Sequence, residues 1–307
     1  MKQFRNLLFI STLLLCWVLV SCKTTRVSSS GWSLVWEENF NQKKGFDPQV
    51  WSKIPRGKAD WNNYMTDFDS CFAMRKGKLV LRGIANQTLP NDTAPYLTGG
   101  VYTKGKKAFL DGRIEICAKL NAAKGAWPAI WTTGGSTDSW CWEWPLGGEI
   151  DLLEYYLVNG KPSVHANVCW GSDTRWNGKW QSYNRPVAEF IAKDKDWGKK
   201  YHIWRMDWCL DEDENTLRLY LDDELMNEIK DLKATTGNGS GGLDDWWRGS
   251  YRNPYLDEGN NAGKENDEGF GQCIWLNLAL GSNGGEPDLS KFPLEYHVDY
   301  VRVYQFE

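Results

Sequence analysis

Short segments that alternate polar and apolar residues recur along this chain. The clearest are residues 78–82, 112–118, 217–221 and 298–304. A period of two is typical of antiparallel strands that bury one face and leave the other in water. Helical patterns are scarce, and only the stretch 186–193 could wind a turn or two. Many short strands with almost no helix predict an all-β fold, a jelly-roll β-sandwich of two antiparallel sheets.

The length and composition suit one well-packed domain. The chain has 307 residues with 19 Trp, and 41% of it is hydrophobic, so enough apolar surface exists for a large core. The formal net charge is −4 and no basic block is present, which argues against a nucleic-acid partner. No repeat or linker interrupts the chain after Trp32, so we predict a single domain over residues 32–307 and a monomer.

Residues 1–22 have the pattern of an export signal. A basic start precedes a mostly apolar run at residues 7–20, which is shorter than the roughly 20 residues that a membrane-spanning helix needs. The run ends in Leu19-Val20-Ser21-Cys22, which resembles the lipobox of bacterial lipoproteins. We therefore predict export, lipidation of Cys22, a polar tether at residues 23–31, and a lipid anchor in the bacterial cell envelope as the only membrane contact. Plain cleavage with Cys22 unmodified is the alternative.

The mature part of the chain has six Cys, since Cys16 and Cys22 of the eight belong to the export segment. They are spread singly without a C-x-x-C pair, so neither a zinc ribbon nor a thioredoxin-like motif is spelled out. Disulfides are allowed outside the cytoplasm, but a domain of this size does not need them. We predict mostly buried thiols.

The stretch 235–268 is long and polar and has the character of an elaborated surface loop. It also carries four aromatic residues: Trp246, Trp247, Tyr251 and Tyr255. These side chains either contact a ligand or fasten the loop to the body of the domain, and the sequence leaves both possibilities open.

Three acids lie close together in one apolar, strand-like stretch: Glu149, Asp151 and Glu154. In a regular strand Glu149 and Asp151 share a face, whereas Glu154 points to the opposite one. A β-bulge at Leu152-Leu153 would bring all three carboxyls into one groove. Crowding then raises at least one pKa, as a general acid at neutral pH requires. An exposed acidic strand or a calcium site is the alternative.

Paired carboxylic acids are the usual groups for hydrolysing a glycosidic bond, and a separation of about 5 to 5.5 Å lets one act as nucleophile with retention. Glu149 and Glu154 are the pair that this chain offers. The run from Glu149 to Glu154 resembles the bulged E-x-D-x-x-E signature of glycoside hydrolase family 16. The resemblance implies that Glu149 is the nucleophile, that Glu154 is the acid/base, and that Asp151 between them tunes the nucleophile.

The resemblance covers most of the mature chain, including residues 125–131, 144–148 and 298–304. It implies a concave sheet face that forms the substrate cleft, where Trp rings stack on sugars through their large flat apolar surface. We expect Trp131 and Trp144 in this cleft. Trp127 and Trp275 fit the cleft or the core equally well. Asn277 is polar within an apolar strand, so it bonds either a sugar hydroxyl or a backbone group.

Residues 163–170 are expected to pair with the acidic strand and to place His165, Asn167 and Cys169 on one face. We predict that Asn167 and Trp170 contact the substrate. His165 either donates to the substrate or is structural.

Two positions depart from the β-1,3-glucanases of the family. Many of those enzymes carry a further His where this chain has Cys169. They also carry an Asn-Glu-Leu-Gln-Tyr-like run in place of residues 61–67, where we predict that Asn63 contacts the substrate. Both departures favour galactose-containing substrates, as in the family's endo-β-galactosidases acting on host glycans such as keratan and O-glycans or on algal galactans.

A structural calcium ion is common in the family. The positions that match its site are Asn39, Gly77 and Asp299. Asp299 fits an ordinary outward residue of an alternating strand equally well. The resemblance implies no required cofactor, because retaining hydrolysis with two carboxyls needs no metal.

Two function classes follow from these patterns. The first is a lipid-anchored, retaining endo-β-glycosidase that acts on a galactose-containing polysaccharide or glycan, with an endo-β-1,3-glucanase as the alternative. The second is a non-catalytic glycan-binding lipoprotein, which would explain the Trp content but not three acids on one groove. A Ser-His hydrolase is disfavoured, because the chain has only three His and no G-x-S-x-G elbow.

Overall fold

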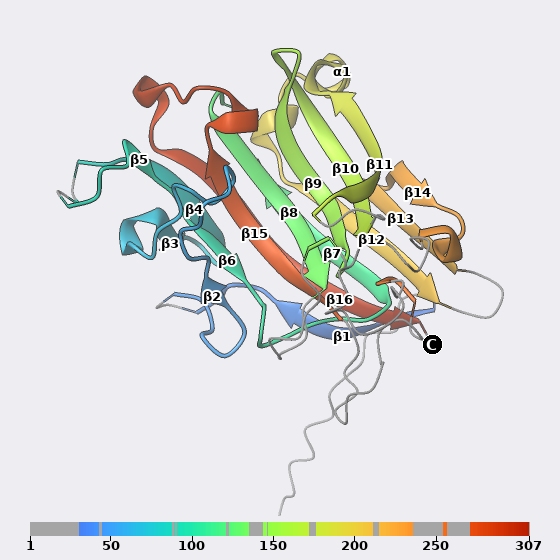
Figure 1. Ribbon diagram of the computed structural model, residues 1–307. Coiled ribbons are helices and arrows are strands. Elements are labelled where there is room, and N and C mark those ends of the chain that lie inside the picture. Colours follow the sequence, from blue (N-terminus) through green and yellow to red (C-terminus); the bar gives the residue numbers. More distant parts are fainter. Residues whose placement is uncertain are drawn as a thin grey trace, which may run out of the picture.

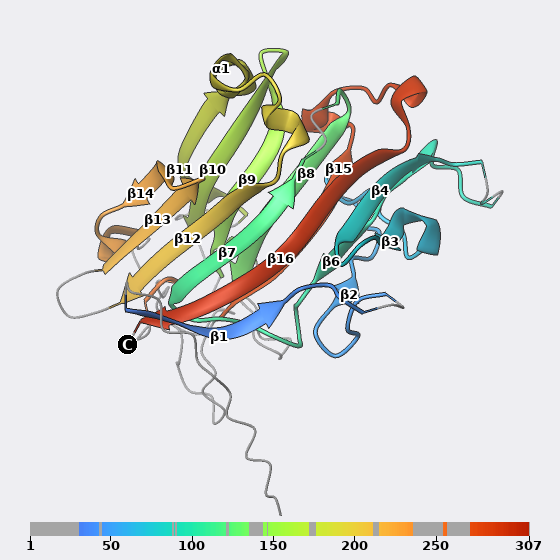
Figure 2. The ribbon, with the colours of Figure 1, turned by 180° about the vertical axis from the view of Figure 1, so that it is seen from behind.

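Two antiparallel sheets lie face to face in the computed structural model (Figure 1). It describes residues 31–42, 45–87, 89, 91–120, 123–134, 144–145, 147–171, 176–210, 215–235, 254–256 and 271–306. A seven-stranded sheet faces the viewer in Figure 1, and a nine-stranded sheet faces the viewer in Figure 2. This two-layer arrangement confirms the predicted all-β sandwich.

The nine-stranded sheet consists of β1 (Trp32–Glu38), β3 (Phe72–Met74), β4 (Leu79–Ala85), β5 (Tyr96–Leu97), β7 (Gly112–Lys119), β12 (His202–Leu210), β13 (Asn215–Leu221), β14 (Glu224–Ile229) and β16 (Leu294–Phe306). Its strand order is β14-β13-β12-β7-β16-β4-β3, with β1 paired to β16 and β5 paired to β4. All four alternating segments of the sequence lie in this sheet.

The seven-stranded sheet consists of β2 (Ser52–Lys53), β6 (Gly100–Tyr102), β8 (Ala126–Gly134), β9 (Glu149–Val158), β10 (Lys161–Gly171), β11 (Gly178–Pro186) and β15 (Gln272–Leu280). Its strand order is β11-β10-β9-β8-β15-β6-β2, so the acidic strand β9 lies between β8 and β10. The predicted pairing of residues 163–170 with the acidic strand is therefore confirmed.

Helices are short and few among the described residues. The α-helix α1 (Val187–Lys193) falls within the one stretch that the sequence offered for a helix. The 3₁₀ helices are η1 (Asp69–Cys71), η2 (Trp197–Lys199), η3 (Leu232–Thr235), η4 (Ser282–Gly284) and η5 (Leu289–Lys291). Within the described ranges no helix is long and apolar enough to cross a membrane.

The alternation of each strand explains how the sheets pack. Along β7, buried residues alternate with half-buried ones over the full length of the strand. The buried side chains of the two sheets meet in one large core, whose biggest fully buried members include Trp51, Trp204, Trp208, Tyr155, Tyr255 and Tyr296. Of the described mature-chain thiols, Cys71, Cys169 and Cys273 are buried, as predicted, whereas Cys117 and Cys209 are half-buried.

Several predicted features lie outside the described residues. They are the export signal with Cys22, most of the polar tether, Cys141, Trp246, Trp247 and Tyr251.

Candidate active site

The strand β9 contains the predicted bulge. Asp151 lies opposite Asn167 of β10, and Glu154 lies opposite His165, so Leu152 and Leu153 together oppose a single residue. The register of β9 against β8 also shifts within this stretch. The extra residue resets the alternation of side chains, as expected for a bulge. All three acids consequently point to the outer face of the seven-stranded sheet, where they line one cleft.

Strand pairing arranges the outer face of this sheet in three rows, each containing one acid. The first row is Cys273, Thr133, Glu149, Cys169 and Trp180. The second row is Tyr102, Trp275, Trp131, Asp151, Asn167 and Ser182. The third row is Gly100, Asn277, Ala129, Glu154, His165 and Asn184. Residues that line the cleft therefore lie on strands on both sides of the acids.

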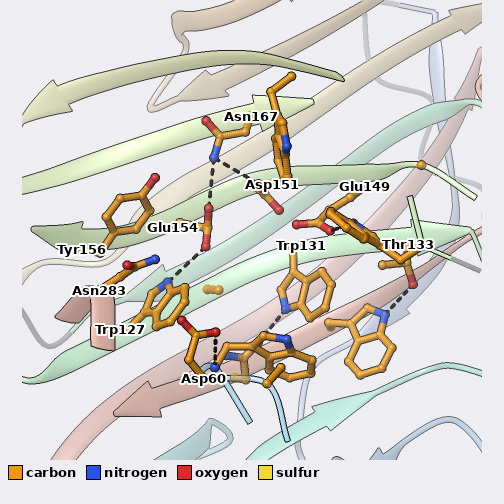
Figure 3. A pocket seen from close by; sticks show the side chains of 18 of the residues that line it. Asp60, Trp127, Trp131, Thr133, Glu149, Asp151, Glu154, Tyr156, Asn167 and Asn283 are labelled. Carbon is orange, nitrogen blue, oxygen red and sulfur yellow. Dashed lines mark hydrogen bonds between the residues drawn. The ribbon is translucent and has the colours of Figure 1, made fainter. Parts of the chain in front are cut away.

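The cleft has a volume of about 770 Å³ and combines the three acids with aromatic and amide side chains (Figure 3). The predicted residues Trp131, Trp144, Asn167 and Asn277 line it. Trp127 and Trp275, for which the core was an equal alternative, also line the cleft. Aromatic residues that the sequence analysis did not select line it as well, namely Trp61, Tyr156 and Trp180.

Each of the three acids accepts a hydrogen bond from a neighbouring side chain. Trp144 Nε1 donates to Glu149 Oε2 at 2.5 Å, and Trp127 Nε1 donates to Glu154 Oε1 at 3.1 Å. The Asn167 amide donates both to Asp151 Oδ2 at 3.1 Å and to Glu154 Oε2 at 3.0 Å. Asn167 thus positions two of the acids. The sequence analysis predicted only that Asn167 contacts the substrate.

Burial and mutual repulsion raise the pKa of all three acids. Burial is the largest cause for each of them. The charge of Glu154 adds to this effect on Glu149, whose pKa rises to about 8. The pKa values of Asp151 and Glu154 lie well above the ordinary values of Asp and Glu. The cluster therefore holds protons at neutral pH, as general acid catalysis requires and as the sequence predicted.

A stack of aromatic rings forms one bank of the cleft. Trp275 stacks on Tyr102 at 4.6 Å and on Trp131 at 4.9 Å between ring centroids. Since these partners come from the strands on either side of β15, they cover both faces of the Trp275 ring. Trp131 Nε1 donates to Asn277 Oδ1 at 2.6 Å, and Trp61 packs edge-on against Trp131. The stack fixes the orientation of Trp131 beside Asp151.

His165 lies on the predicted face but is covered. Its ring stacks on that of Tyr156 at 3.6 Å between centroids, and Tyr156 rather than His165 lines the cleft. Burial lowers the pKa of His165 to about 4, so the ring is neutral at physiological pH. This environment supports the structural alternative for His165 in the ligand-free cleft.

Two residues that were predicted to contact the substrate do not line the cleft. Trp170 does not line the cleft but packs against the core between the sheets, because alternation turns it to the face opposite Asn167 and Cys169. Asn63 does not line the cleft either. From the loop that carries it, Asp60 and Trp61 line the cleft instead. A loop has no fixed period, so its sequence did not reveal which side chain faces the cleft.

One of the predicted calcium positions, Asp299, is already paired with a cation. Asp299 forms an ion pair with Lys78 at 2.5 Å, so a cation at this carboxylate would have to displace the ammonium group. In the described part of the chain, no group of three or more His, Cys, Asp or Glu side chains is placed to hold a metal ion. Main-chain oxygens near Asn39 and Gly77 are a different kind of ligand, and a site built on them stays a prediction.

Among the missed residues, Trp180 and Ser182 had a detectable signal. They are two residues apart on the edge strand β11, so they share the face that also carries Asn184. Trp180 is 44% exposed, unusually open for such a large ring, and its centroid lies 6.4 Å from that of Trp144. If side chains alternate along residues 178–186 as in a strand, this Trp lies on the same face of the sheet as the acids.

Comparison with known proteins agrees with this geometry. The family model described as glycosyl hydrolases family 16 matches residues 66–239. The keratan-sulfate endo-1,4-beta-galactosidase of Sphingobacterium multivorum is 30% identical over 284 residues, which cover 92% of this chain and 57% of that protein. The glucan endo-1,3-beta-glucosidase A1 of Niallia circulans is 27% identical over 302 residues, covering 90% of this chain and 38% of that protein. The chain thus spans 57% and 38% of the length of these curated relatives.

A solved structure from work on endo-acting O-glycanases, which human gut bacteria express to initiate mucin breakdown, has a TM-score of 0.68 to this chain. It is 26% identical, and the match covers 92% of this chain and 94% of the other. The family match includes the whole of β9 and its bulge. The chain belongs to glycosyl hydrolases family 16.

Proposed function

We propose that this chain is a retaining endo-β-glycosidase. The observation that carries the proposal is the β9 bulge, which brings Glu149, Asp151 and Glu154 to the floor of one aromatic cleft. Burying three acids together raises their pKa values and is unfavourable in a purely structural strand. A pair of carboxyls in which one is charged and one protonated is what retaining hydrolysis uses.

In the first step, a carboxylate oxygen of Glu149 attacks the anomeric carbon and forms an ester bond. The bond from that carbon to the bridging oxygen breaks, and Glu154 gives its proton to the departing oxygen. The hydrogen bond from Trp144 favours the ionised form of Glu149. Asp151, next to Glu149 on the same face, adds a carboxyl that shares the protons of the cluster.

In the second step, a water molecule attacks the anomeric carbon and gives its proton to Glu154. The ester bond to Glu149 breaks, so the sugar leaves with its original configuration and both carboxyls return to their starting states. The two-carboxyl mechanism itself requires no metal ion.

Attack at internal bonds is supported by the extent of the cleft. Binding groups lie on β8 and β15 to one side of the acids, and on β10 and β11 to the other. Asn277 keeps its amide donors for a sugar oxygen, since its Oδ1 already accepts from Trp131. A polymer can therefore extend past the acids in both directions.

We propose galactose-containing glycans as the substrate class. The similarity to a keratan-sulfate endo-1,4-beta-galactosidase supports this choice, as does Cys169 at a position that often carries His in β-1,3-glucanases. The similarity to a glucan endo-1,3-beta-glucosidase keeps laminarin-type glucans as the second candidate.

The test is product analysis by mass spectrometry. Residues 23–307 are incubated with keratan, mucin O-glycans, agarose, porphyran, laminarin and mixed-linkage glucan, beside the matched variants Glu149→Gln and Glu154→Gln. Oligosaccharides from keratan, O-glycans or a galactan, absent with both variants, are the expected result. Products from laminarin alone would select the glucanase, and binding without products from any polymer would select a glycan-binding protein.

We also propose that the chain is exported and lipid-anchored. The lipobox-like run ending at Cys22 supports this localisation. Mass spectrometry of the N-terminal peptide from membranes should show a diacylglycerol-modified Cys22, and an unmodified soluble protein would contradict it.

A further inference from the structure

The proposed nucleophile stands at a strand end. Glu149 is the first residue of β9, and it follows Gly148, whose φ of +74° lies in the left-handed region. Strand ends receive less support from ladder hydrogen bonds than strand interiors, so they open more easily. The carboxylate itself is held by Trp144, a side chain that is 37% exposed. This end therefore needs a further anchor to keep the nucleophile in place.

Tyr255 lies against the backbone of Glu149. Its hydroxyl accepts from the Glu149 N–H at 3.0 Å and lies 3.0 Å from the Glu149 carbonyl oxygen. The same hydroxyl is also hydrogen-bonded to the carbonyl oxygen of Cys169, the partner of Glu149 on β10. The hydroxyl has one proton to donate, so it joins the Glu149 N–H to one of these two carbonyl groups at a time. The first residue of β9 is thereby linked to β10 through the phenol.

Both sheets hold the Tyr255 side chain. Its ring is fully buried, and a Cβ atom at Gly148 would lie 2.8 Å from ring atoms, so the absence of a side chain at Gly148 makes room for the phenol. On the other side, Trp208 Nε1 of β12 donates to the Tyr255 carbonyl oxygen at 3.1 Å, and the two rings pack edge to face. The phenol is therefore a rigid support for the strand end.

We propose that Tyr255 is a positioning residue that sets the place of the Glu149 carboxylate by holding the Glu149 backbone. The inference rests on the proposed function, in which Glu149 is the nucleophile. Tyr255 lies 106 residues from Glu149 in the chain and is buried in the core rather than lining the cleft, so it acts without touching the substrate. Small displacements of a nucleophile can slow a reaction by about 100-fold, which gives this distant hydroxyl a large effect on rate.

The first experiment compares two Tyr→Phe variants on the polymer that the wild-type protein cleaves. Tyr255→Phe keeps the ring and removes the hydroxyl, so we expect kcat to fall by about tenfold or more while KM changes less than about twofold. Tyr296→Phe is the matched control, because Tyr296 is also fully buried but its hydroxyl has no hydrogen-bond partner among the described residues. An unchanged kcat in Tyr255→Phe would overturn the inference.

The second experiment separates positioning from general destabilisation. In a Glu149→Ala background, azide can attack the anomeric carbon of a 4-nitrophenyl glycoside while Glu154 protonates the departing oxygen, and a glycosyl azide forms. With no carboxylate left to position, adding Tyr255→Phe should change the azide-dependent rate by less than about twofold. A loss as large as that in the wild-type background would show that Tyr255 acts on the whole site and not through Glu149.

A third variant tests the inference even if Tyr255→Phe fails to fold. Trp208→Phe removes the hydrogen bond to the Tyr255 carbonyl while leaving the phenol intact, and we expect a smaller fall in kcat in the same direction. Normal kcat in both Trp208→Phe and a folded Tyr255→Phe would reject the inference with the glycosidase assignment intact. Absence of activity in the wild-type protein would instead reject the proposed function.

Discussion

Asn167 donates a hydrogen bond from Nδ2 to Oε2 of Glu154 at 3.0 Å, and the same nitrogen reaches Asp151. A donor aimed at a carboxylate favours its ionised form. This contact lowers the pKa of Glu154, whereas burial, the largest influence, raises it. The amide therefore helps to set the pH at which the proposed acid/base loses its proton.

Asn167→Ala should move the alkaline limb of the kcat/KM profile to higher pH. Without the amide, burial and the charge of Asp151 raise the pKa of Glu154 further, so the acid stays protonated over a wider range. The rate at the optimum should fall because two acids lose their common donor. The check is a pH profile beside that of Asn184→Ala, an exposed neighbour on β11; an alkaline limb that stays in place would contradict the assignment.

Trp144→Phe should weaken catalysis most at low pH. The indole N–H donates to Glu149 and lowers its pKa, so its loss raises that pKa and moves the acidic limb to higher pH. Hydrogen bonds to charged groups contribute about 1.5 to 3 kcal/mol, which corresponds to a fall in kcat/KM of about 10- to 150-fold. Steady-state kinetics from acidic to alkaline pH measure both effects. Equal losses at every pH would mean that Trp144 acts only as a sugar platform.

Glu149→Gln should make the protein more stable at pH 8 than the wild type. The folded pKa of Glu149 is raised from 4.5 to about 8, mainly by burial, so the folded state keeps a proton that the unfolded state releases. Unfolding free energy therefore falls as the pH rises from about 4.5 to about 8. The Gln side chain does not titrate, so the Tm advantage of the variant should grow over this window. Parallel Tm curves for the two proteins would refute the raised pKa.

His202→Gln should lose most stability at acidic pH. Burial alone would lower the pKa of His202, but its two ring nitrogens face Asp222 at 2.6 Å and the Trp197 carbonyl at 2.8 Å, and the pKa is raised overall. Because the folded pKa exceeds the unfolded one, this stabilisation is fully present below the unfolded pKa of about 6.5. It is lost as the pH rises through the folded value. Denaturant titrations should give a larger difference between the proteins at pH 5 than at pH 9, and a pH-independent difference would contradict it.

The period of two was enough to predict the sandwich and the acidic strand. Residues 112–118 and 298–304 alternate because one face of each strand is buried, and this cause acts locally. The bulge at Leu152-Leu153 was predictable on chemical grounds, since no regular strand could place Glu154 beside Asp151. Strand type and the acidic face were thus properties that the sequence determined alone.

The walls of the cleft were decided by tertiary structure. Trp127 and Trp170 are both Trp residues in strands near the acids, yet one lines the cleft and the other packs into the core. Alternation turns Trp170 away from the face of Asn167 and Cys169 and places Trp127 on the face of Trp131, whereas residue type alone does not distinguish the two. Tyr255 lies far from Glu149 in sequence, in a stretch without a period, and only the packing of the two sheets brings its hydroxyl to the start of β9. Local alternation thus determined the strands and the acids, whereas long-range packing decided what surrounds them.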